Sequence, residues 1–125
     1  MLVEADAHVP RISPDQARAM IARGGVVLVD VREAPEVALS GKIRGALHVP
    51  RGMLEFRADP QSPYFDPAFR TDTPVILYCA VGGRSALAGL TLKDMGYPLV
   101  YNLGGFEDWA KAGGDVEPAA PGSTG

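Results

Sequence analysis

A short apolar run, Val75–Cys79, restricts the fold of this chain most strongly. It is too short for a helix, rich in β-branched and aromatic residues and preceded by a proline, so it predicts a buried strand that ends at the cysteine. Gly82 and Gly83 then allow a tight turn, and Ser85 is a suitable N-cap for a helix over residues 86–95. The sequence therefore predicts a strand, a loop and a helix in succession, with Cys79 at the carboxyl end of the strand.

A second continuous apolar run covers residues 26–31 and brings Asp30 to its end. Such a run is typical of a strand covered on both faces, which favours a parallel sheet. Because strands alternate with helical patterns, we expect a small α/β domain with a mostly parallel sheet and helices on both faces. The other expected elements are a helix from Ser13 and Pro14 to Gly24, a short helix over 32–40, a turn and strand over 43–50, a strand over 99–103 and a last helix that packs through Phe106, Trp109 and Ala110.

We expect a single domain over residues 12–115, because 125 residues can bury roughly two-thirds of the surface of the unfolded chain. Residues 1–11 have no periodicity and residues 116–125 lead into a low-complexity end, so both are expected to be flexible. Residues 51–73 contain three prolines that break the segment into turns. That segment could wall a pocket, form a lid or simply pack, and the sequence does not decide between these.

Composition excludes several classes of function. The formal net charge is −3 and no basic run occurs, so nucleic acid and an acidic membrane surface are not expected partners. No secretory signal or membrane-spanning run is visible, so we expect a cytoplasmic protein. The single cysteine, Cys79, excludes an intramolecular disulfide and a multi-cysteine zinc site. A lone cysteine is commonly a packing residue, but the glycines and arginine that follow this one indicate a chemical role.

The loop over residues 80–84 is suited to an anionic sulfur. At a strand-to-helix junction several backbone N–H groups point at one spot, with the positive end of the helix dipole behind them, which favours the Cys79 thiolate. Arg84 could contact the substrate or hold the loop in shape, and Asp30 is expected to support the site structurally. If the thiol packed away from solvent with the amides facing elsewhere, this interpretation would fail.

Four segments of the chain carry distinctive motifs: Asp30-Val31-Arg32-Glu33, residues 41–50 (GKIRGALHVP), residues 78–85 (YCAVGGRS) and residues 102–109 (NLGGFEDW). Together they resemble a single-domain rhodanese. The resemblance covers roughly residues 12–115, and four motifs in the same order and spacing make a chance match improbable. It implies a sulfurtransferase, in which a cysteine takes sulfane sulfur from a donor, becomes a persulfide and passes the outer sulfur to cyanide or a thiol. Lys42 stands where the family usually has a histidine that is generally structural.

The resemblance also implies the site. Cys79 would be the nucleophile and sulfur carrier, and Ala80, Val81, Gly82, Gly83 and Arg84 would bind the substrate, with Asp30 and Ser85 in support. No metal and no organic cofactor are required. The expected partners are small sulfur-containing anions such as thiosulfate or thiol persulfides such as that of glutathione, and a sulfur-donor or acceptor protein. Because thiosulfate-specific relatives carry basic residues directly after the cysteine, thiosulfate is expected to be a poor donor here.

Two other functions stay open. Related phosphatases and arsenate reductases hold an oxyanion in a loop with five residues between Cys and Arg, whereas only four separate Cys79 from Arg84 here, which favours sulfur over phosphate on size. A non-enzymatic protein-binding or redox-sensing module is less favoured, because the cysteine is present. Elsewhere, Arg32 and Glu36 are expected to form an ion pair at a helix start, and His48 is expected to be a packed or surface residue.

Overall fold

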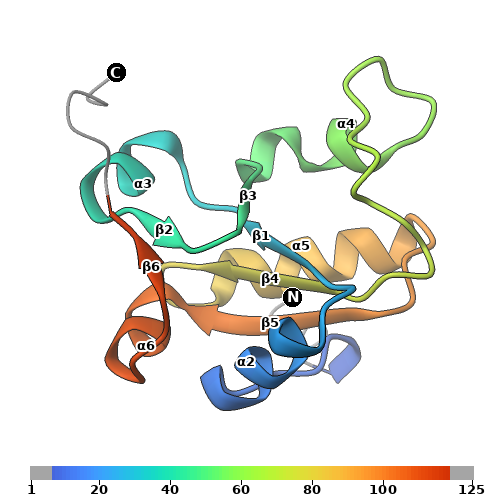
Figure 1. The fold of residues 1–125 in the computed structure, drawn as a ribbon. Coiled ribbons are helices and arrows are strands. Elements are labelled where there is room, and N and C mark those ends of the chain that lie inside the picture. The colour runs from blue at the N-terminus through green and yellow to red at the C-terminus, as the bar shows by residue number, and fades with distance from the viewer. Residues whose placement is uncertain (1–6, 119–125) are drawn as a thin grey trace.

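A computed structural model describes residues 7–118 and shows a four-stranded parallel sheet. Its strand order is β3-β1-β4-β5, and every neighbouring pair is parallel. This arrangement, visible in Figure 1, confirms the expected architecture. The strands are β1 (Val27–Asp30), β3 (Leu47–His48), β4 (Val75–Cys79) and β5 (Val100–Gly105), and a separate antiparallel pair joins β2 (Lys42–Ile43) to β6 (Val116–Glu117).

Helices cover both faces of the sheet because its strands are apolar on both sides. All five residues of β4 are buried: Ile76 and Tyr78 contribute to one core, whereas Val75, Leu77 and Cys79 contribute to the other. The first core includes residues of α2 (Pro14–Arg23) and α6 (Phe106–Lys111), and the second includes residues of α4 (Leu54–Ala58) and α5 (Gly83–Asp94). The remaining helical elements are α3 (Ala34–Ser40), which follows β1, and the 3₁₀ turn η1 (Arg51–Met53), which precedes α4.

The first predicted helix is confirmed together with its cap. The Ser13 hydroxyl accepts a hydrogen bond from the Gln16 backbone N–H at 3.1 Å, and the Gln16 side chain accepts one from the Ser13 N–H at 2.8 Å. This reciprocal capping box satisfies two backbone donors that a helix start leaves without partners. Pro14 occupies the first turn and Gly24 ends the helix, as expected.

The helix after the cysteine begins earlier than the sequence predicts. Gly82, with φ of 104°, is the N-cap of α5, so the assignment of Ser85 as N-cap is wrong. Because a glycine can adopt the left-handed conformation, only residues 80–82 separate the strand from the helix, which begins at Gly83. Ser85 therefore lies inside the first turn of the helix. In α6, Phe106 and Trp109 are buried as predicted, but Ala110 is exposed.

Segments at both ends of the described chain are more ordered than expected. Val9 is 1% exposed and belongs to the core shared with α5, and Arg11 forms a parallel bridge with Asn102 of β5. At the other end, Val116 and Glu117 form β6, which pairs with β2. Both segments add hydrogen bonds to strands that would otherwise be edges, which is why they are held although their sequences have no periodicity. The rest of the expected flexible ends, residues 1–6 and 119–125, lies outside the described residues.

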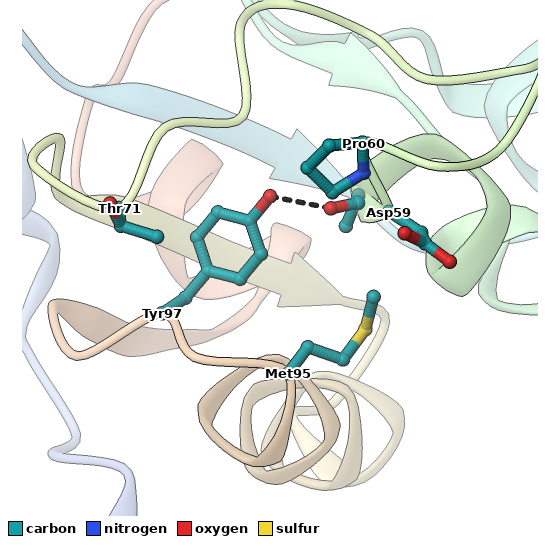
Figure 2. A pocket seen from close by; sticks show the side chains of 6 residues that line it. Asp59, Pro60, Thr71, Met95 and Tyr97 are labelled. Carbon is teal, nitrogen blue, oxygen red and sulfur yellow. Dashed lines mark hydrogen bonds between the residues drawn. The ribbon is translucent and has the colours of Figure 1, made fainter.

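Residues 51–73 form η1, α4 and a series of turns, and part of this segment walls a hollow. Figure 2 shows the hollow, which has a volume of about 280 Å³ and is lined by Ala58, Asp59, Pro60, Thr71, Met95 and Tyr97. The Tyr97 hydroxyl donates a hydrogen bond to the Ala58 carbonyl at 2.5 Å. Because Thr71 precedes β4 and Tyr97 precedes β5, this hollow lies at the amino ends of the strands, away from Cys79.

Candidate active site

Cys79 ends β4 and lies directly beneath the active-site loop, which we define as residues 80–84. The backbone N–H of Gly82 donates a hydrogen bond to the Cys79 Sγ at 2.9 Å. The left-handed conformation of Gly82 turns this N–H back toward the strand end, and α5 starts immediately afterwards with its positive end near the sulfur. The predicted strand, loop and helix therefore bring a backbone donor to the cysteine.

Ser85 and Asn102 complete the surroundings of the thiol. The Ser85 Oγ lies 3.5 Å from the Cys79 Sγ and donates to the Asn102 Oδ1 at 2.7 Å. Asn102 in turn donates to the Gly82 carbonyl at 3.2 Å, and its Oδ1 also accepts from the Gly104 N–H at 2.9 Å. This buried network connects β5 to the loop and to the first turn of α5. Its members fix one another's orientation, because each has few other partners available.

The network affects the ionisation of the thiol. Burial alone raises the pKa of Cys79, but the Ser85 hydroxyl and the backbone N–H groups of Ser85, Gly82 and Val81 outweigh it, so the net pKa is lowered. The donors stabilise the thiolate more than burial destabilises it. A lowered pKa raises the fraction of the nucleophilic form at neutral pH.

Arg84 is held by Glu36, not by the loop carbonyls. Its two terminal nitrogens bond both carboxylate oxygens of Glu36, Nη1 to Oε1 at 2.6 Å and Nη2 to Oε2 at 2.8 Å. The hydrogen bond from Arg84 is the main reason that the pKa of Glu36 is lowered to about 2, and the pair also raises the pKa of Arg84. The expected Arg32–Glu36 pair is wrong, since Glu36 instead connects α3 to α5 through this bidentate bond.

Asp30 and Arg32 form a separate, fully buried pair. The Arg32 Nη2 lies 2.7 Å from the Asp30 Oδ2, and the side chains are only 4% and 0% exposed. The remaining donors of Arg32 bond Ser40 and the Gly41 carbonyl, and its guanidinium stacks on Phe106 at 4.4 Å from the ring centroid. Asp30 thus makes no contact with the loop amides in this structure. The pair holds the carboxyl end of α3 through Ser40 and Gly41 and supports the wall next to the loop.

A hollow of about 380 Å³ lies beside the active-site loop. We call it the loop hollow. Two of the loop residues, Ala80 and Val81, form part of its wall, and Glu36 brings the ion pair with Arg84 to its edge. Gly82 and Gly83 are not among its lining residues. The complete lining consists of Arg32, Glu36, Leu39, Ser40, Ala80, Val81, Phe106 and Glu107.

The sulfur itself has no surface open to solvent. Cys79 is 0% exposed, although an amide faces it as predicted. The predicted amide donor is therefore present, but the predicted contact of the sulfur with water is not observed. Val81, which is 82% exposed, shows that the outer part of this loop is not packed down.

Asn102 is the member of this site that sequence reasoning missed. The residue stands inside the apolar segment 99–103, where a polar side chain is unusual, and that is the signal that could have revealed it. It is 1% exposed, and the hydrogen bonds of its side chain involve the loop, α5 and β5. A buried amide in a strand has to be hydrogen-bonded, so its neighbours are necessarily polar or backbone groups.

The fold and this cysteine loop define the class, and the chain belongs to the rhodanese-like domain family, whose model matches residues 13–112. Thiosulfate sulfurtransferase GlpE of Actinobacillus succinogenes is 34% identical over 109 residues, which cover 86% of this chain and 90% of the relative. The human thiosulfate:glutathione sulfurtransferase is 28% identical over 110 residues, covering 82% of this chain and 95% of the relative. A solved structure from Rhodopseudomonas palustris, described as a protein of unknown function and possible tyrosine phosphatase, has a TM-score of 0.85 at 44% identity, with 93% of this chain and 90% of that chain covered.

These similarities confirm the predicted class of enzyme, a sulfurtransferase with the rhodanese fold. They also agree with the predicted parallel α/β architecture. Within residues 7–118, no helix has the length and apolar character needed to cross a membrane.

Proposed function

We propose that Cys79 is the sulfur carrier of this sulfurtransferase and that the active-site loop stabilises both its thiolate and its persulfide. The observation that carries the proposal is the 2.9 Å hydrogen bond from the Gly82 N–H to the Cys79 Sγ, made in a network that lowers the pKa of the thiol. A cysteine kept only for packing has no need of such donors, since they stabilise charge on sulfur.

The reaction divides into two displacements on sulfur. The Cys79 thiolate attacks the outer sulfur of the donor, the S–S bond of the donor breaks, and sulfite or a thiolate leaves with the electron pair. The acceptor, a thiolate or cyanide, then attacks the outer sulfur of the Cys79 persulfide and releases the Cys79 thiolate. Both enzyme forms are anionic, so the same backbone donors stabilise each of them.

In this proposal Arg84 maintains the shape of the loop. This role is supported by its two hydrogen bonds to Glu36, which tether the end of the loop to α3. Ser85 acts on the sulfur through its hydroxyl, and Asp30 supports the wall through Arg32.

Thiosulfate and thiol persulfides are both candidate donors, and a small thiol or a protein thiol is the candidate acceptor. The cytoplasmic location expected from the sequence stays a prediction.

The test follows sulfur on the intact protein. Incubation with thiosulfate, or separately with glutathione persulfide, should add one sulfur atom, which cyanide should remove as thiocyanate. Intact-mass spectrometry of the wild type and of Cys79→Ala measures this directly. Equal loading of both proteins would show that Cys79 is not the carrier.

The phosphatase alternative is tested with an aryl phosphate, because the Rhodopseudomonas palustris structure is described as a possible tyrosine phosphatase. Only four residues separate Cys79 from Arg84, and Arg84 is already bonded to Glu36, so we expect no Cys79-dependent hydrolysis. Hydrolysis that is lost in Cys79→Ser, measured by release of the phenol, would contradict sulfur transfer as the main activity. Failure with every sulfane donor, together with specific capture of one protein, would favour the binding module.

A further inference from the structure

We propose that the loop hollow binds the organic part of the acceptor thiol, and that it selects a small thiol with an apolar body and no negative charge. This inference rests on the proposed function, because it assigns the substrate class of the same site. Neither the family nor the relatives' activities determine which thiol this chain prefers. The charge and polarity of the residues that line the loop hollow favour one class of thiol over another.

The apolar part of the wall is unusually exposed. Leu39 is 87% exposed and Val81 is 82% exposed, the two highest values among the large hydrophobic residues that the structure describes as exposed. Both line the loop hollow, together with Ala80 and Phe106. Large apolar side chains gathered beside a reactive site indicate that a ligand covers them. The volume of about 380 Å³ lies in the range of small-molecule pockets, roughly 300 to 1,000 Å³.

The two cations at the loop hollow are already neutralised. Arg32 is paired with Asp30, and its other donors bond Ser40 and the Gly41 carbonyl. Arg84, whose partner Glu36 lies in the wall, is held by that carboxylate at both terminal nitrogens. Because the pKa of Glu36 is lowered to about 2, this pair stays ionised at neutral pH and has no net charge.

Glu107 supplies the one lining charge that has no ion-pair partner within residues 7–118. Its carboxylate forms no ion pair there, and Lys111, one helical turn further along α6, is not within ion-pair distance. An anionic thiol entering the loop hollow therefore meets the Glu107 carboxylate, whereas Arg32, the cation in the lining, is already paired with Asp30. A neutral or cationic thiol meets apolar surface and a favourable charge.

The selected thiol reacts by the second displacement. Its thiolate attacks the outer sulfur of the Cys79 persulfide, the S–S bond to Cys79 breaks, and the Cys79 thiolate leaves with the electron pair. The product is the persulfide of the small thiol. No oxidant or reductant is consumed, because the transferred sulfur keeps its oxidation state.

A matched series of two-carbon thiols tests the charge preference. Cys79 is first loaded with inorganic polysulfide, and transfer to cysteamine, 2-mercaptoethanol or 2-mercaptoethanesulfonate is followed by intact mass at low ionic strength. Each rate is divided by the rate of the same thiol with a small disulfide in solution, which corrects for intrinsic reactivity. We expect the corrected rate for cysteamine to exceed that for the sulfonate by about threefold to tenfold, since Glu107 is exposed and its charge partly screened. Glutathione, an anionic thiol, should fall near the sulfonate.

Substitutions inside and outside the loop hollow test whether its lining residues cause the preference for uncharged or cationic thiols. Glu107→Lys should reverse the order of cysteamine and sulfonate, whereas Asp108→Asn, on the same helix but outside the loop hollow, should leave it unchanged. Leu39→Ser should slow transfer to butanethiol about threefold or more while leaving 2-mercaptoethanol nearly unaffected. Leu99→Ser, an exposed leucine elsewhere on the surface, is the control.

The outcomes separate this inference from the proposed function. If Cys79 never accepts sulfur, the proposed function fails. If Cys79 loads and cyanide discharges it normally, but the corrected rates of all thiols are equal or the anionic ones are faster, only the substrate preference is overturned. Faster transfer to a cysteine-containing peptide than to every small thiol would also overturn it, and would indicate a protein acceptor.

Discussion

At the level of single residues, the reactivity of Cys79 depends on which acceptor receives the hydrogen bond from the Ser85 hydroxyl. The Ser85 hydroxyl lies within reach of the Cys79 Sγ, the Asn102 Oδ1 and the Gly82 carbonyl, yet it can donate to only one of them at a time. While the thiol is protonated, Asn102 is the closest acceptor at 2.7 Å. When the sulfur becomes anionic, the hydroxyl gains by turning toward it, because hydrogen bonds to charged groups are stronger.

Ser85→Ala should therefore raise the pKa of Cys79. The substitution removes the side-chain donor that most opposes the effect of burial. Alkylation by iodoacetamide, measured against pH, should show its midpoint at higher pH and a lower rate at neutral pH than in the wild type. Thermal denaturation of the same variant shows how much of the change comes from a loosened loop. An unchanged midpoint would assign the lowered pKa to the backbone donors alone.

Two of the Arg–Asp pairs in this chain, Arg32–Asp30 and Arg70–Asp72, allow a direct comparison of buried and exposed charge. Asp30→Asn leaves the buried Arg32 guanidinium without its partner and should lower the free energy of unfolding by about 3 kcal/mol or more. Asp72→Asn removes the partner of Arg70, where both side chains are 66% exposed, and should leave the free energy of unfolding almost unchanged. Urea denaturation measures both. Equal losses would contradict the structural role assigned to Asp30.

At the level of elements, the sequence predicts the strands and the position of the cysteine well, because their patterns are local. The strand over Val75–Cys79 and the capped first helix are confirmed within a residue or two. The pairing of Glu36 with Arg84 was not predicted, since the two residues are 48 positions apart and only the packing of α3 near α5 brings them together. Ser85 was misassigned because a serine before an apolar run fits an N-cap, and the conformation of Gly82 that overrides it is not encoded locally.

The contact between β5 and the active-site loop leads to a prediction about Gly105. This glycine pairs with Cys79, and a Cβ at its position would lie 2.5 Å from the Ala80 carbonyl oxygen. Gly105→Ala should displace the loop, lower the melting temperature by several degrees and slow sulfur loading of Cys79. Gly52→Ala, where a Cβ meets nothing within 4 Å, is the matched control. Normal loading in Gly105→Ala would show that the loop tolerates displacement.

At the level of the whole molecule, acid should lower the free energy of unfolding by breaking the Glu36–Arg84 ion pair, which joins α3 to α5. The pKa of Glu36 is lowered from 4.5 to about 2 in the folded chain, so the unfolded chain binds the proton more readily. The contribution of the pair to stability is therefore complete above pH 4.5 and is lost as the pH falls through about 2. Urea midpoints between pH 6 and pH 2 should fall less steeply in Glu36→Gln than in the wild type. Glu107→Gln, which removes a carboxylate that forms no ion pair within residues 7–118, is the matched control.

The ends of the described chain show why the limits of the domain could not be predicted. Val9 and Arg11 stand in a segment without periodicity, and only the tertiary structure shows that Val9 packs beside Gly89 and Val100. Likewise Val116 has a strand partner that lies far away in the sequence, in β2. Sequence patterns report local structure, whereas these two segments are held by contacts with distant elements.

The position of Arg11 matters when this domain is fused to or grafted onto another protein. Its guanidinium lies against Gly104 of β5 and against Gly82, whose N–H bonds the sulfur, although the match to the family begins only at residue 13. A chimera that began at residue 13, where the family match begins, would keep all four motifs but would lose Arg11 and its contact with the two glycines. Grafts and fusions should start upstream of Val9, and a junction placed later would change the reactivity of the thiol without altering any residue of its loop.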